Sequence, residues 1–495
     1  MVVGLLASGL LCAAVTPAQA SAATRRTSHA PRTVGRVSSA LGDWLTYDYD
    51  NGRSGFDPVG PAIATLSARP VWNDDSLDGA VYGEPLVFDG TAYVATEADT
   101  IYAIDARNGA VRWKVQVGSA PTVSVIDSAP TLGGGCGDID PLGITGTPVI
   151  DPLTSEIFVA EETELAGRAR WQSVRHWVVA VSLKRHHQVW RRDIDPPRPN
   201  RSGTYFIAAE QERSALTLYD GRLYTAYGGL EGDCGQYHGY VVGLAETGKG
   251  PLLSYQVPTA REGGIWGTSG VMVSTQGDLY VATGNGSSNN VANYDEGNSV
   301  IELSPTLRRI GVWAPSNWVR LNDDDWDLGS AGPIQVPGTS LLFAAGKPAG
   351  LDSFGSLMRE GQLGGVGHGA SSGPLCKGGG VYGADASDVI GGRIFIYAAC
   401  GGGTQAVQVN ASSLSFHRIW IPSSGTPNGP PIVAGGRVWA LDWNGNELYG
   451  MNPLTGRVVV ERTTDGLNHF ATPAAAEGML LVPTYSGVEA YRAIG

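Results

Sequence analysis

Three observations predict an all-β fold, and more specifically an eight-bladed β-propeller. The 495 residues include 70 glycines and 29 prolines, and only 16% of them are charged, a composition typical of many short strands joined by turns. One phrase of two apolar strands occurs eight times along the chain. Successive phrases lie roughly 40 to 70 residues apart, which suits a four-stranded blade, whereas solenoid repeats are shorter and more uniform.

The N-terminal region has the features of an export segment. Residues 5–15 (LLASGLLCAAV) form an apolar run too short to span a bilayer, and small-residue cleavage sites follow it. We therefore expect an export signal over residues 1–20, a solvated linker over residues 21–41 and a single propeller over residues 42–495. Because no Lys or Arg precedes the apolar run, a buried N-terminal strand is the alternative.

Composition also excludes several classes of protein. The formal net charge of -13 argues against a nucleic-acid surface, and no other apolar segment is long enough to cross a membrane. The mature protein is therefore expected to be soluble and secreted, periplasmic or held in the cell envelope. No CxxCH motif is present, so no c-type haem is expected.

The cysteines predict disulfides rather than a metal site. Four of them lie beyond the expected signal, at Cys136, Cys234, Cys376 and Cys400. An even count in an exported chain favours two disulfides, and the order of the repeats suggests pairing Cys136 with Cys234 and Cys376 with Cys400. The spacing lacks the paired CxxC pattern of zinc sites.

The recurring phrase is a small residue or proline, an apolar strand, a turn and a second apolar strand of the LYVA kind. Its eight occurrences begin at Pro85, Pro148, Ser214, Ser269, Ala331, Ala386, Pro430 and Pro473. Several continue into a third strand and a glycine turn, as in IYAIDARNGAVRWKV (101–115) and LYGMNPLTGRVVVER (448–462). Asn-Gly and Thr-Gly turn the chain there, and Trp113 is expected to contact a neighbouring blade.

These phrases resemble the pyrroloquinoline quinone (PQQ) repeat of quinoprotein alcohol dehydrogenase-like propellers, whose signature is close to A-x-D-x-x-T-G-x-x-x-W. The resemblance covers about residues 42 to 494 and implies the quinoprotein type of eight-bladed propeller. The opening segment DWLTYDYDNGRSGFDP (43–58) looks like the N-terminal strand that closes the ring in that family. The same repeat builds PQQ-dependent dehydrogenases and cofactor-free scaffolds, so it predicts the fold and leaves the function open.

A PQQ dehydrogenase needs a flat floor under the quinone, hard oxygen ligands for calcium and a carboxylate base. The segment GGIWGTSGVMVSTQGDLYVATGNG (263–286) is similar to the family segment that supplies the floor and a calcium-binding asparagine. The matching residues are Trp266 and Asn285. An inter-blade packing role for Trp266 and a turn role for Asn285 are the alternatives.

Two downstream segments extend the resemblance. LNDDDWDLGSAGP (321–333) is similar to the family segment in which the Asp after Trp is the catalytic base and a metal ligand, so that residue is Asp327. A cluster of four aspartates needs a cation or lysine nearby; a solvated acidic loop is the alternative. LLFAAGKPAG (341–350) resembles the strand that ends in a basic quinone contact, here Lys347.

The second phrase carries the remaining candidates. LGITGTPVIDPLTSEIFVAEETELAG (142–167) looks like the family's threonine-bearing strand followed by its calcium-binding glutamate. Thr145 fits the quinone-contact position. The glutamate is Glu161, Glu162 or Glu164, and we favour Glu164.

Three departures from the family favour a protein without this activity. The vicinal Cys-Cys pair over the quinone is absent, as is the Arg-Gly-containing strand, and LDSFGSLMREGQLGG (351–365) replaces the usual strand of blade five. Arg213 begins a strand, where we favour a surface salt bridge over a place in the channel.

Two hypotheses for the function follow from the sequence. The first is a PQQ- and calcium-dependent dehydrogenase of a small alcohol or sugar with an external electron acceptor. The second is a non-catalytic propeller that binds a protein or a cell-envelope polymer.

Overall fold

The computed structural model describes residues 1, 42–118, 122–124, 135–165, 174–197, 207–348 and 350–495. The chain divides into two units, Met1–Arg36 and Val37–Gly495, and the fold below is that of the second. The expected export signal (1–20) and linker (21–41) lie outside the described residues, apart from Met1.

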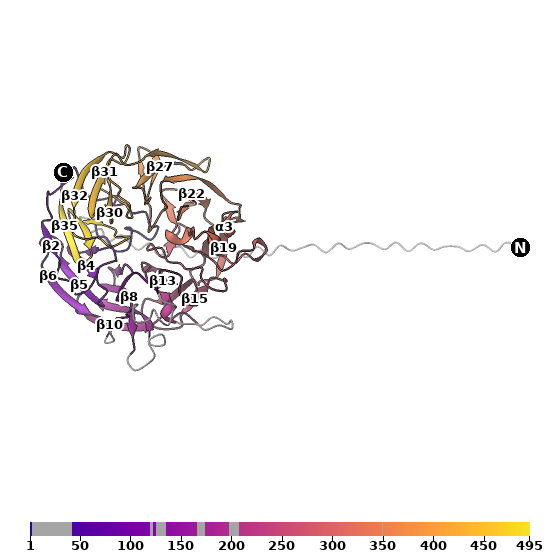
Figure 1. Cartoon of the computed structure of the whole chain (residues 1–495). Helices are drawn as coiled ribbons and strands as arrows, with labels where there is room; N and C mark the ends of the chain where they lie inside the picture. The colour runs from indigo at the N-terminus through magenta and orange to yellow at the C-terminus, as the bar shows by residue number, and fades with distance from the viewer. Residues whose placement is uncertain (2–41, 119–121, 125–134, 166–173, 198–206, 349) are drawn as a thin grey trace. The chain divides into compact units, whose positions relative to one another are not determined.

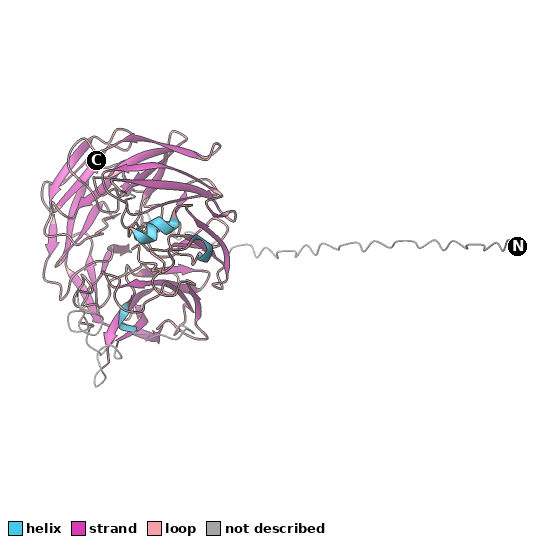
Figure 2. Ribbon diagram, turned by 45° about the vertical axis from the view of Figure 1, so that its right-hand side comes forward, coloured by secondary structure: helices cyan, strands magenta, loops and turns pink. Residues whose placement is uncertain are grey.

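The second unit is an eight-bladed β-propeller, as the repeats predict. Eight sheets of four or five strands, antiparallel except for one parallel strand pair in blade 4, stand around a common centre (Figure 1). The described helices are short and lie in loops (Figure 2): η1 (Ile207–Ala209), η2 (Val291–Asn293), α3 (Trp318–Asp323) and η3 (Leu328–Ser330).

Blades 1 to 4 follow in chain order. Blade 1 consists of β3 (Leu86–Phe88), β4 (Thr91–Ala95), β5 (Thr100–Asp105) and β6 (Val111–Gln116). Blade 2 consists of β7 (Val149–Asp151), β8 (Glu156–Glu164), β9 (Val174–Ser182) and β10 (His187–Asp193). Blade 3 consists of β11 (Glu210–Gln211), β12 (Thr217–Tyr219), β13 (Arg222–Gly229), β14 (Tyr240–Ala245) and β15 (Leu253–Gln256). Blade 4 consists of β16 (Met272–Val273), β17 (Leu279–Ala282), β18 (Val300–Leu303), β19 (Arg309–Ala314) and β23 (Gly365–Val366).

Blades 5 to 8 complete the ring. Blade 5 consists of β20 (Ile334–Val336), β21 (Leu341–Ala345), β22 (Asp352–Arg359) and β24 (Ala370–Lys377). Blade 6 consists of β25 (Ala386–Ile390), β26 (Arg393–Ala398), β27 (Gln405–Asn410) and β28 (Ser415–Trp420). Blade 7 consists of β29 (Ile432–Ala434), β30 (Arg437–Asp442), β31 (Glu447–Met451) and β32 (Val458–Thr463). Blade 8 consists of β33 (Ala474–Ala476), β34 (Met479–Thr484), β35 (Gly487–Ile494), β1 (Thr65–Leu66) and β2 (Trp72–Asp74).

Each recurring phrase forms the two innermost strands of one blade. The phrase at Pro85 precedes β3 and β4, and the phrase at Pro473 precedes β33 and β34. Second strands such as β4, β21 and β34 are buried along their whole length, whereas outer strands such as β6 alternate toward solvent. The apolar core therefore lies between adjacent blades, where the inner and middle strands stack.

The glycine turns explain how neighbouring blades dock. Gly109 has a φ of 75°, and a Cβ there would lie 2.8 Å from the Trp72 ring. The Trp72 indole N–H donates to the Ala106 carbonyl at 3.0 Å, so blade 8 packs onto the turn of blade 1. Glycine is needed because only it combines a left-handed backbone with this close approach. Trp113, as expected, spans blades and stacks on His186 of the β9–β10 turn at 4.9 Å.

The ring closes differently from the sequence expectation. Segment 43–58 is not the closing strand; β1 and β2 pair with β35 instead. Residues 44–57, the channel segment, run through the centre and contact the innermost strands of blades 1 to 7. The inner-strand partners are Val87, Ile150, Thr217, Val273, Gln335, Ser387 and Val433. The segment satisfies backbone groups that these strands leave unpaired at the channel wall.

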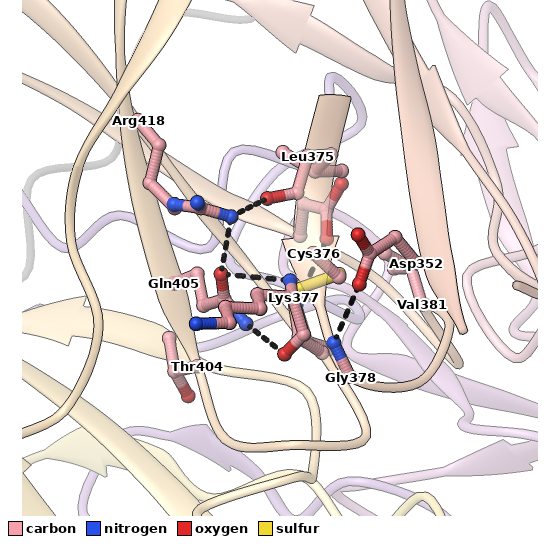
Figure 3. The surroundings of a disulfide bond; sticks show 12 residues. Asp352, Leu375, Cys376, Lys377, Gly378, Val381, Thr404, Gln405 and Arg418 are labelled. Atoms are coloured by element: carbon pink, nitrogen blue, oxygen red, sulfur yellow. Dashed lines mark hydrogen bonds between the residues drawn. A yellow bond between two sulfur atoms is a disulfide. The ribbon is translucent and has the colours of Figure 1, made fainter. Parts of the chain in front are cut away.

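Two disulfides are present, and both pairings expected from the sequence are confirmed: one joins the loop between blades 1 and 2 to a loop of blade 3, and the other joins blades 5 and 6. Cys136 bonds Cys234, and Cys376 bonds Cys400. Figure 3 shows the second bond, which links Cys376 near the end of β24 to Cys400, two residues after β26. Beside it, the Gln405 side chain accepts from the Lys377 N–H at 3.1 Å and donates to the Lys377 carbonyl at 3.0 Å.

Candidate functional site

Four of the six candidate residues lie together between blades 4 and 5. Trp266 precedes β16, Asn285 follows β17, Asp327 precedes η3 and Lys347 follows β21. The Asp327 carboxylate accepts from the Asn285 backbone N–H at 2.6 Å and pairs with the Lys347 ammonium at 2.9 Å. The same ammonium lies 5.3 Å from the centre of the Trp266 ring. Residues up to 81 positions apart thus meet because each follows or precedes an inner strand.

The charge of Asp327 is compensated within the protein. Asp327 is 5% exposed; burial raises its pKa, and the adjacent Lys347 opposes that rise. Burial lowers the pKa of Lys347, but Asp327 and Asp325 outweigh this effect and raise it. Lys347 is therefore charged at neutral pH and its positive charge is shared by two carboxylates. This pair, rather than a solvated acidic loop, holds Asp327 in place.

The Asn285 side chain is also engaged. Its amide N–H donates to Asp325 at 2.9 Å, and its amide oxygen accepts from Asn298 at 3.3 Å. Asn285 is thus part of an amide and carboxylate network rather than a simple turn residue. Among the described residues, no group of three or more His, Cys, Asp or Glu side chains is arranged to hold a metal ion.

The three candidate glutamates at the end of β8 have different surroundings. Glu161 pairs with Arg191. Glu162 accepts from the Glu212 N–H at 3.0 Å and lies 3.6 Å from the His176 imidazole. Glu164 is half-buried and stands opposite Val174 in the sheet. The role of Glu164 as a calcium ligand remains a prediction.

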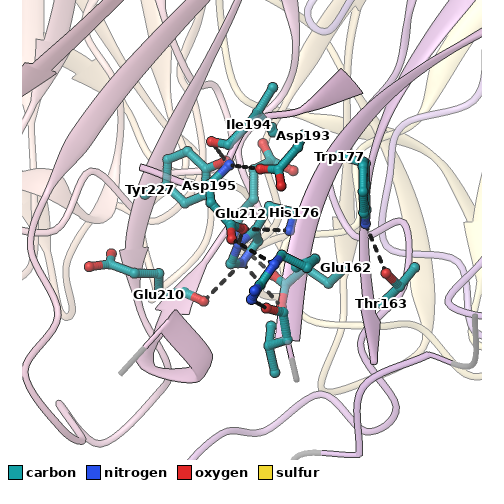
Figure 4. A network of polar contacts seen from close by, with 12 residues as sticks. Glu162, Thr163, His176, Trp177, Asp193, Ile194, Asp195, Glu210, Glu212 and Tyr227 are labelled. Atoms are coloured by element: carbon teal, nitrogen blue, oxygen red, sulfur yellow. Dashed lines mark hydrogen bonds and ion pairs between the residues drawn. The ribbon is translucent and has the colours of Figure 1, made fainter. Parts of the chain in front are cut away.

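Glu162 belongs to a buried charge network that sequence reasoning missed (Figure 4). His176, on β9, is fully buried; its Nδ1 lies 3.1 Å from Asp195 and its Nε2 lies 3.2 Å from the Glu210 carbonyl. Burial lowers the pKa of His176, yet Glu162 and Asp195 outweigh it and raise this pKa well above its usual value. A protonated His176 therefore compensates Glu162, as Lys347 compensates Asp327.

Thr145 lines the wall of the central channel. It is buried and lines a cavity of about 10 Å³, which is the volume of a single water molecule. The lining residues are Tyr47, Tyr82, Thr145, Thr147, Arg213, Thr268, His469 and Phe470. The surface salt bridge favoured for Arg213 is wrong, because Arg213 is buried in this wall, 3.0 Å from the His469 Nε2.

Aromatic side chains cover the mouth of this channel. Phe470 stacks on Tyr382 with centroids 6.0 Å apart and contacts Trp443 at 5.5 Å, while its ring lies 6.4 Å from Trp266. Adjacent His469 lies 4.8 Å from Phe470. All five rings, here called the aromatic cluster, are partly exposed. Burial and the Arg213 charge lower the pKa of His469 to about 4, so it is neutral at pH 7.

The sequence carried one signal that could have found these residues. Trp266 lies three residues before its phrase, at Ser269, and Phe470 lies three before Pro473. Thr145, Arg213 and Tyr382 likewise stand in the few residues before a phrase. The loop that enters each innermost strand therefore supplies the channel wall, whatever motif it contains.

The arrangement does not fit a quinone stacked on Trp266. Lys347 and Phe470 lie near the Trp266 ring, and the cavity beside Thr145 holds about 10 Å³, whereas ligand pockets have volumes of about 300 Å³ or more. A larger cavity of about 290 Å³ lies on another side of Lys347, lined by Trp313, Leu321, Trp326 and Phe354 among others. Trp266, Asn285 and Asp327 are not part of its lining.

Comparison with known proteins agrees with the repeat. The family model described as outer membrane protein assembly factor BamB matches residues 61–174. No curated protein matches the chain. The structure of quinohemoprotein alcohol dehydrogenase ADHIIG from Pseudomonas putida HK5 is similar, with a TM-score of 0.61 and 13% identity, covering 91% of this chain and 80% of that one.

Two further structures are similar. Quinohemoprotein alcohol dehydrogenase from Comamonas testosteroni has a TM-score of 0.60 and 14% identity, covering 91% of this chain and 80% of that one. BamB from Moraxella catarrhalis has a TM-score of 0.52 and 11% identity, covering 86% of this chain and 99% of that one. At these identities the likeness concerns the fold.

The repeat, the eight blades and these matches define a class, the β-propellers of the quinoprotein kind. The family model covers residues 61–174, and the rest of the ring resembles quinoprotein propellers in its fold. Among the described residues, no helix has the length and apolar character needed to span a membrane.

Proposed function

We propose that this PQQ-repeat propeller is an exported, non-catalytic binding protein that holds a cell-envelope polymer at the aromatic cluster. The observation that carries the proposal is Phe470, which lies among Trp266, Tyr382 and Trp443 at the channel mouth. Partly exposed aromatic rings bury large apolar area at little entropic cost, and the apolar faces of sugar rings pack on them. Neutral His469 and buried Arg213 supply polar contacts beside the rings.

Charge compensation supports the same proposal. Asp327 is paired with Lys347 and Glu162 with His176, so neither carboxylate needs a bound cation. A buried carboxylate that lacked such a partner would be expected to recruit one.

A dehydrogenase of a small alcohol or sugar, using PQQ, calcium and an external electron acceptor, is the second candidate. It is favoured by the meeting of Trp266, Asn285, Asp327 and Lys347 at one place. In that case Asp327 would be the base and Trp266 the floor. Phe470 would have to leave its position for the quinone to stack.

One titration separates the two candidates. Purified mature protein is titrated with PQQ and calcium while quinone absorbance is followed, and dye reduction is then measured with alcohols, polyols and sugars. The binding proposal expects no saturable quinone binding and no turnover. Calcium-dependent binding that Asp327→Ala or Asn285→Ala abolishes would overturn it and support the dehydrogenase.

A second experiment tests the aromatic cluster directly. Soluble glycan fragments of a cell envelope are titrated while tryptophan fluorescence is recorded. Trp443→Ala and Tyr382→Ala should each weaken binding by at least about tenfold. Tyr485→Ala removes an exposed aromatic ring outside the cluster and should leave the affinity unchanged. Equal affinities in all four proteins would reject the cluster as the binding site.

A further inference from the structure

A second cavity, outside the channel, has a strongly acidic wall. It has a volume of about 320 Å³ and lies among the β4–β5 turn, the β34–β35 turn and the loops around residues 78–80 and 140–141. Four of its lining residues are acidic, Asp78, Glu97, Asp99 and Asp140. Among the described lining residues none is Lys, Arg or His. We call it the acidic cavity.

The two acids of its inner wall are deeply buried. Glu97 and Asp99 are each 1% exposed. The Glu97 carboxylate accepts from the Gly143 N–H at 2.6 Å. Within the described part of the chain, neither oxygen of the Asp99 carboxylate has a hydrogen-bond partner. An unpartnered buried carboxylate is costly, so Asp99 marks a position where a donor from outside the chain would be stabilising.

The two cationic side chains near these carboxylates already have other partners in the protein. Arg191 is the cation that acts on Asp99, but it is hydrogen bonded to Glu161. Arg213 acts on Glu97, but it contacts His469 and lies over Phe470. The other charges facing Asp99 are the carboxylates of Glu161, Glu97 and Glu162. The cavity wall therefore has an excess of acidic groups over cations.

The outer part of the cavity combines a carboxylate with an aromatic ring, which suits a positively charged group. Asp78 is held by the hydroxyls of Thr96 and Thr100 at 2.9 Å and 2.8 Å. Tyr485, 59% exposed, lines the same cavity. An aromatic ring near carboxylates is a favourable environment for an ammonium group, through cation–π attraction and charge pairing.

The size of the cavity decides between kinds of cation. A metal ion would need several ligands at about 2 Å, and the described residues contain no group of three His, Cys, Asp or Glu arranged for one. A volume of about 320 Å³ matches a small organic molecule. We propose that the acidic cavity binds an organic ammonium ion of diamine or polyamine size, with one amine at Asp99 and Glu97 and the rest of the molecule between Asp78, Asp140 and Tyr485.

The protonation of Asp99 and Glu97 makes amine binding at this site depend on pH. Burial raises the pKa of Asp99 to about 9 and that of Glu97 to about 8, and the neighbouring carboxylates add to both shifts. Both groups are therefore largely protonated at pH 7 when no cation is bound. An ammonium ion favours their charged forms, so binding releases protons and strengthens as the pH rises toward 9.

The test is calorimetric titration of the full mature chain with spermidine and with 1,4-diaminobutane at pH 7.5, in two buffers of different ionisation enthalpy. We expect saturable binding with net proton release. Asp99→Asn keeps the side-chain size, and asparagine tolerates the left-handed φ of 58° at this position; it should weaken binding by at least about tenfold. Asp220→Asn, at an exposed turn of blade 3, is the matched control and should bind like the wild type.

Two further variants keep the proposal falsifiable if Asp99→Asn folds poorly. Tyr485→Ala and Asp140→Asn change exposed residues of the cavity and should weaken binding several-fold without affecting stability. Absence of saturable binding, binding unchanged in all cavity variants, or tighter competing binding of Ca²⁺ at the same residues would each overturn the proposal. The proposed function does not depend on this outcome.

Discussion

Asp327, which precedes η3, and Asp99, in the β4–β5 turn, are both buried aspartates, yet their surroundings differ. Asp327 has the Lys347 ammonium at 2.9 Å and a backbone N–H at 2.6 Å. Among the described residues, Asp99 has a hydrogen-bond partner for neither carboxylate oxygen, and burial raises its pKa to about 9. A carboxylate with its own cation has no need of a ligand, whereas one without a cation is either protonated or available to a positive ligand.

The largest expected effect comes from removing the cation beside Asp327. Lys347→Gln leaves a buried carboxylate uncompensated, which should lower the free energy of unfolding by about 3 to 5 kcal/mol. Urea unfolding at pH 7.5 measures the loss, with the exposed Lys184→Gln as control. Calcium should restore part of the stability of Lys347→Gln and none in the wild type. A stability equal to the wild type would show that the pair contributes nothing.

His176→Gln tests the second compensated carboxylate. It should cost about 3 kcal/mol because Glu162, 2% exposed, loses its cation. The folded-state pKa of His176 lies well above the unfolded value of 6.5. The stabilisation is therefore complete below about pH 6.5 and is lost as the pH rises through the folded pKa. Unfolding is measured from pH 6 upward. The difference in unfolding free energy between His176→Gln and the wild type should narrow as the pH rises, whereas the exposed His187→Gln should not differ from the wild type.

Asp99→Asn should alter the pH dependence of stability. The folded-state pKa of about 9 exceeds the ordinary value of 3.8, so the folded protein binds more protons and its stability falls as the pH rises between these values. The Asp99→Asn variant has no carboxyl group at this position. The slope of its free energy of unfolding against pH should therefore be shallower by up to about 1.4 kcal/mol per pH unit. Urea unfolding at pH 5, 7 and 9 measures both slopes; parallel curves would contradict the protonated Asp99.

The smallest effect is expected at the rim of the acidic cavity. Asp78 is exposed and accepts from two threonine hydroxyls. Asp78→Asn should change the free energy of unfolding by less than about 1 kcal/mol while weakening amine binding about threefold. Thermal unfolding and calorimetry on the same sample separate the two effects. A large loss of stability would mean that Asp78 is a structural residue rather than a binding one.

The sequence predicted the eight blades and singled out four residues that the structure brings together. The eight phrases became the inner strand pairs, and both disulfides were paired correctly. Trp266, Asn285, Asp327 and Lys347 meet because their motifs stand at fixed places relative to inner strands. The route of residues 44–57 was missed, because their backbone bonds to six different blades and the Arg53 side chain to a seventh, and no local pattern encodes such partners.

The sequence alone determined the class of fold, since alternating strands, glycine turns and a repeat length act locally within each blade. Tertiary structure alone decided which carboxylates have a cation. Phe470 lies at the channel mouth beside Trp266, and Tyr485 lines the acidic cavity with Asp99, although the members of each pair are more than 200 residues apart in the sequence. Burial and charge compensation depend on distances between blades, and these distances exist only once the ring has closed.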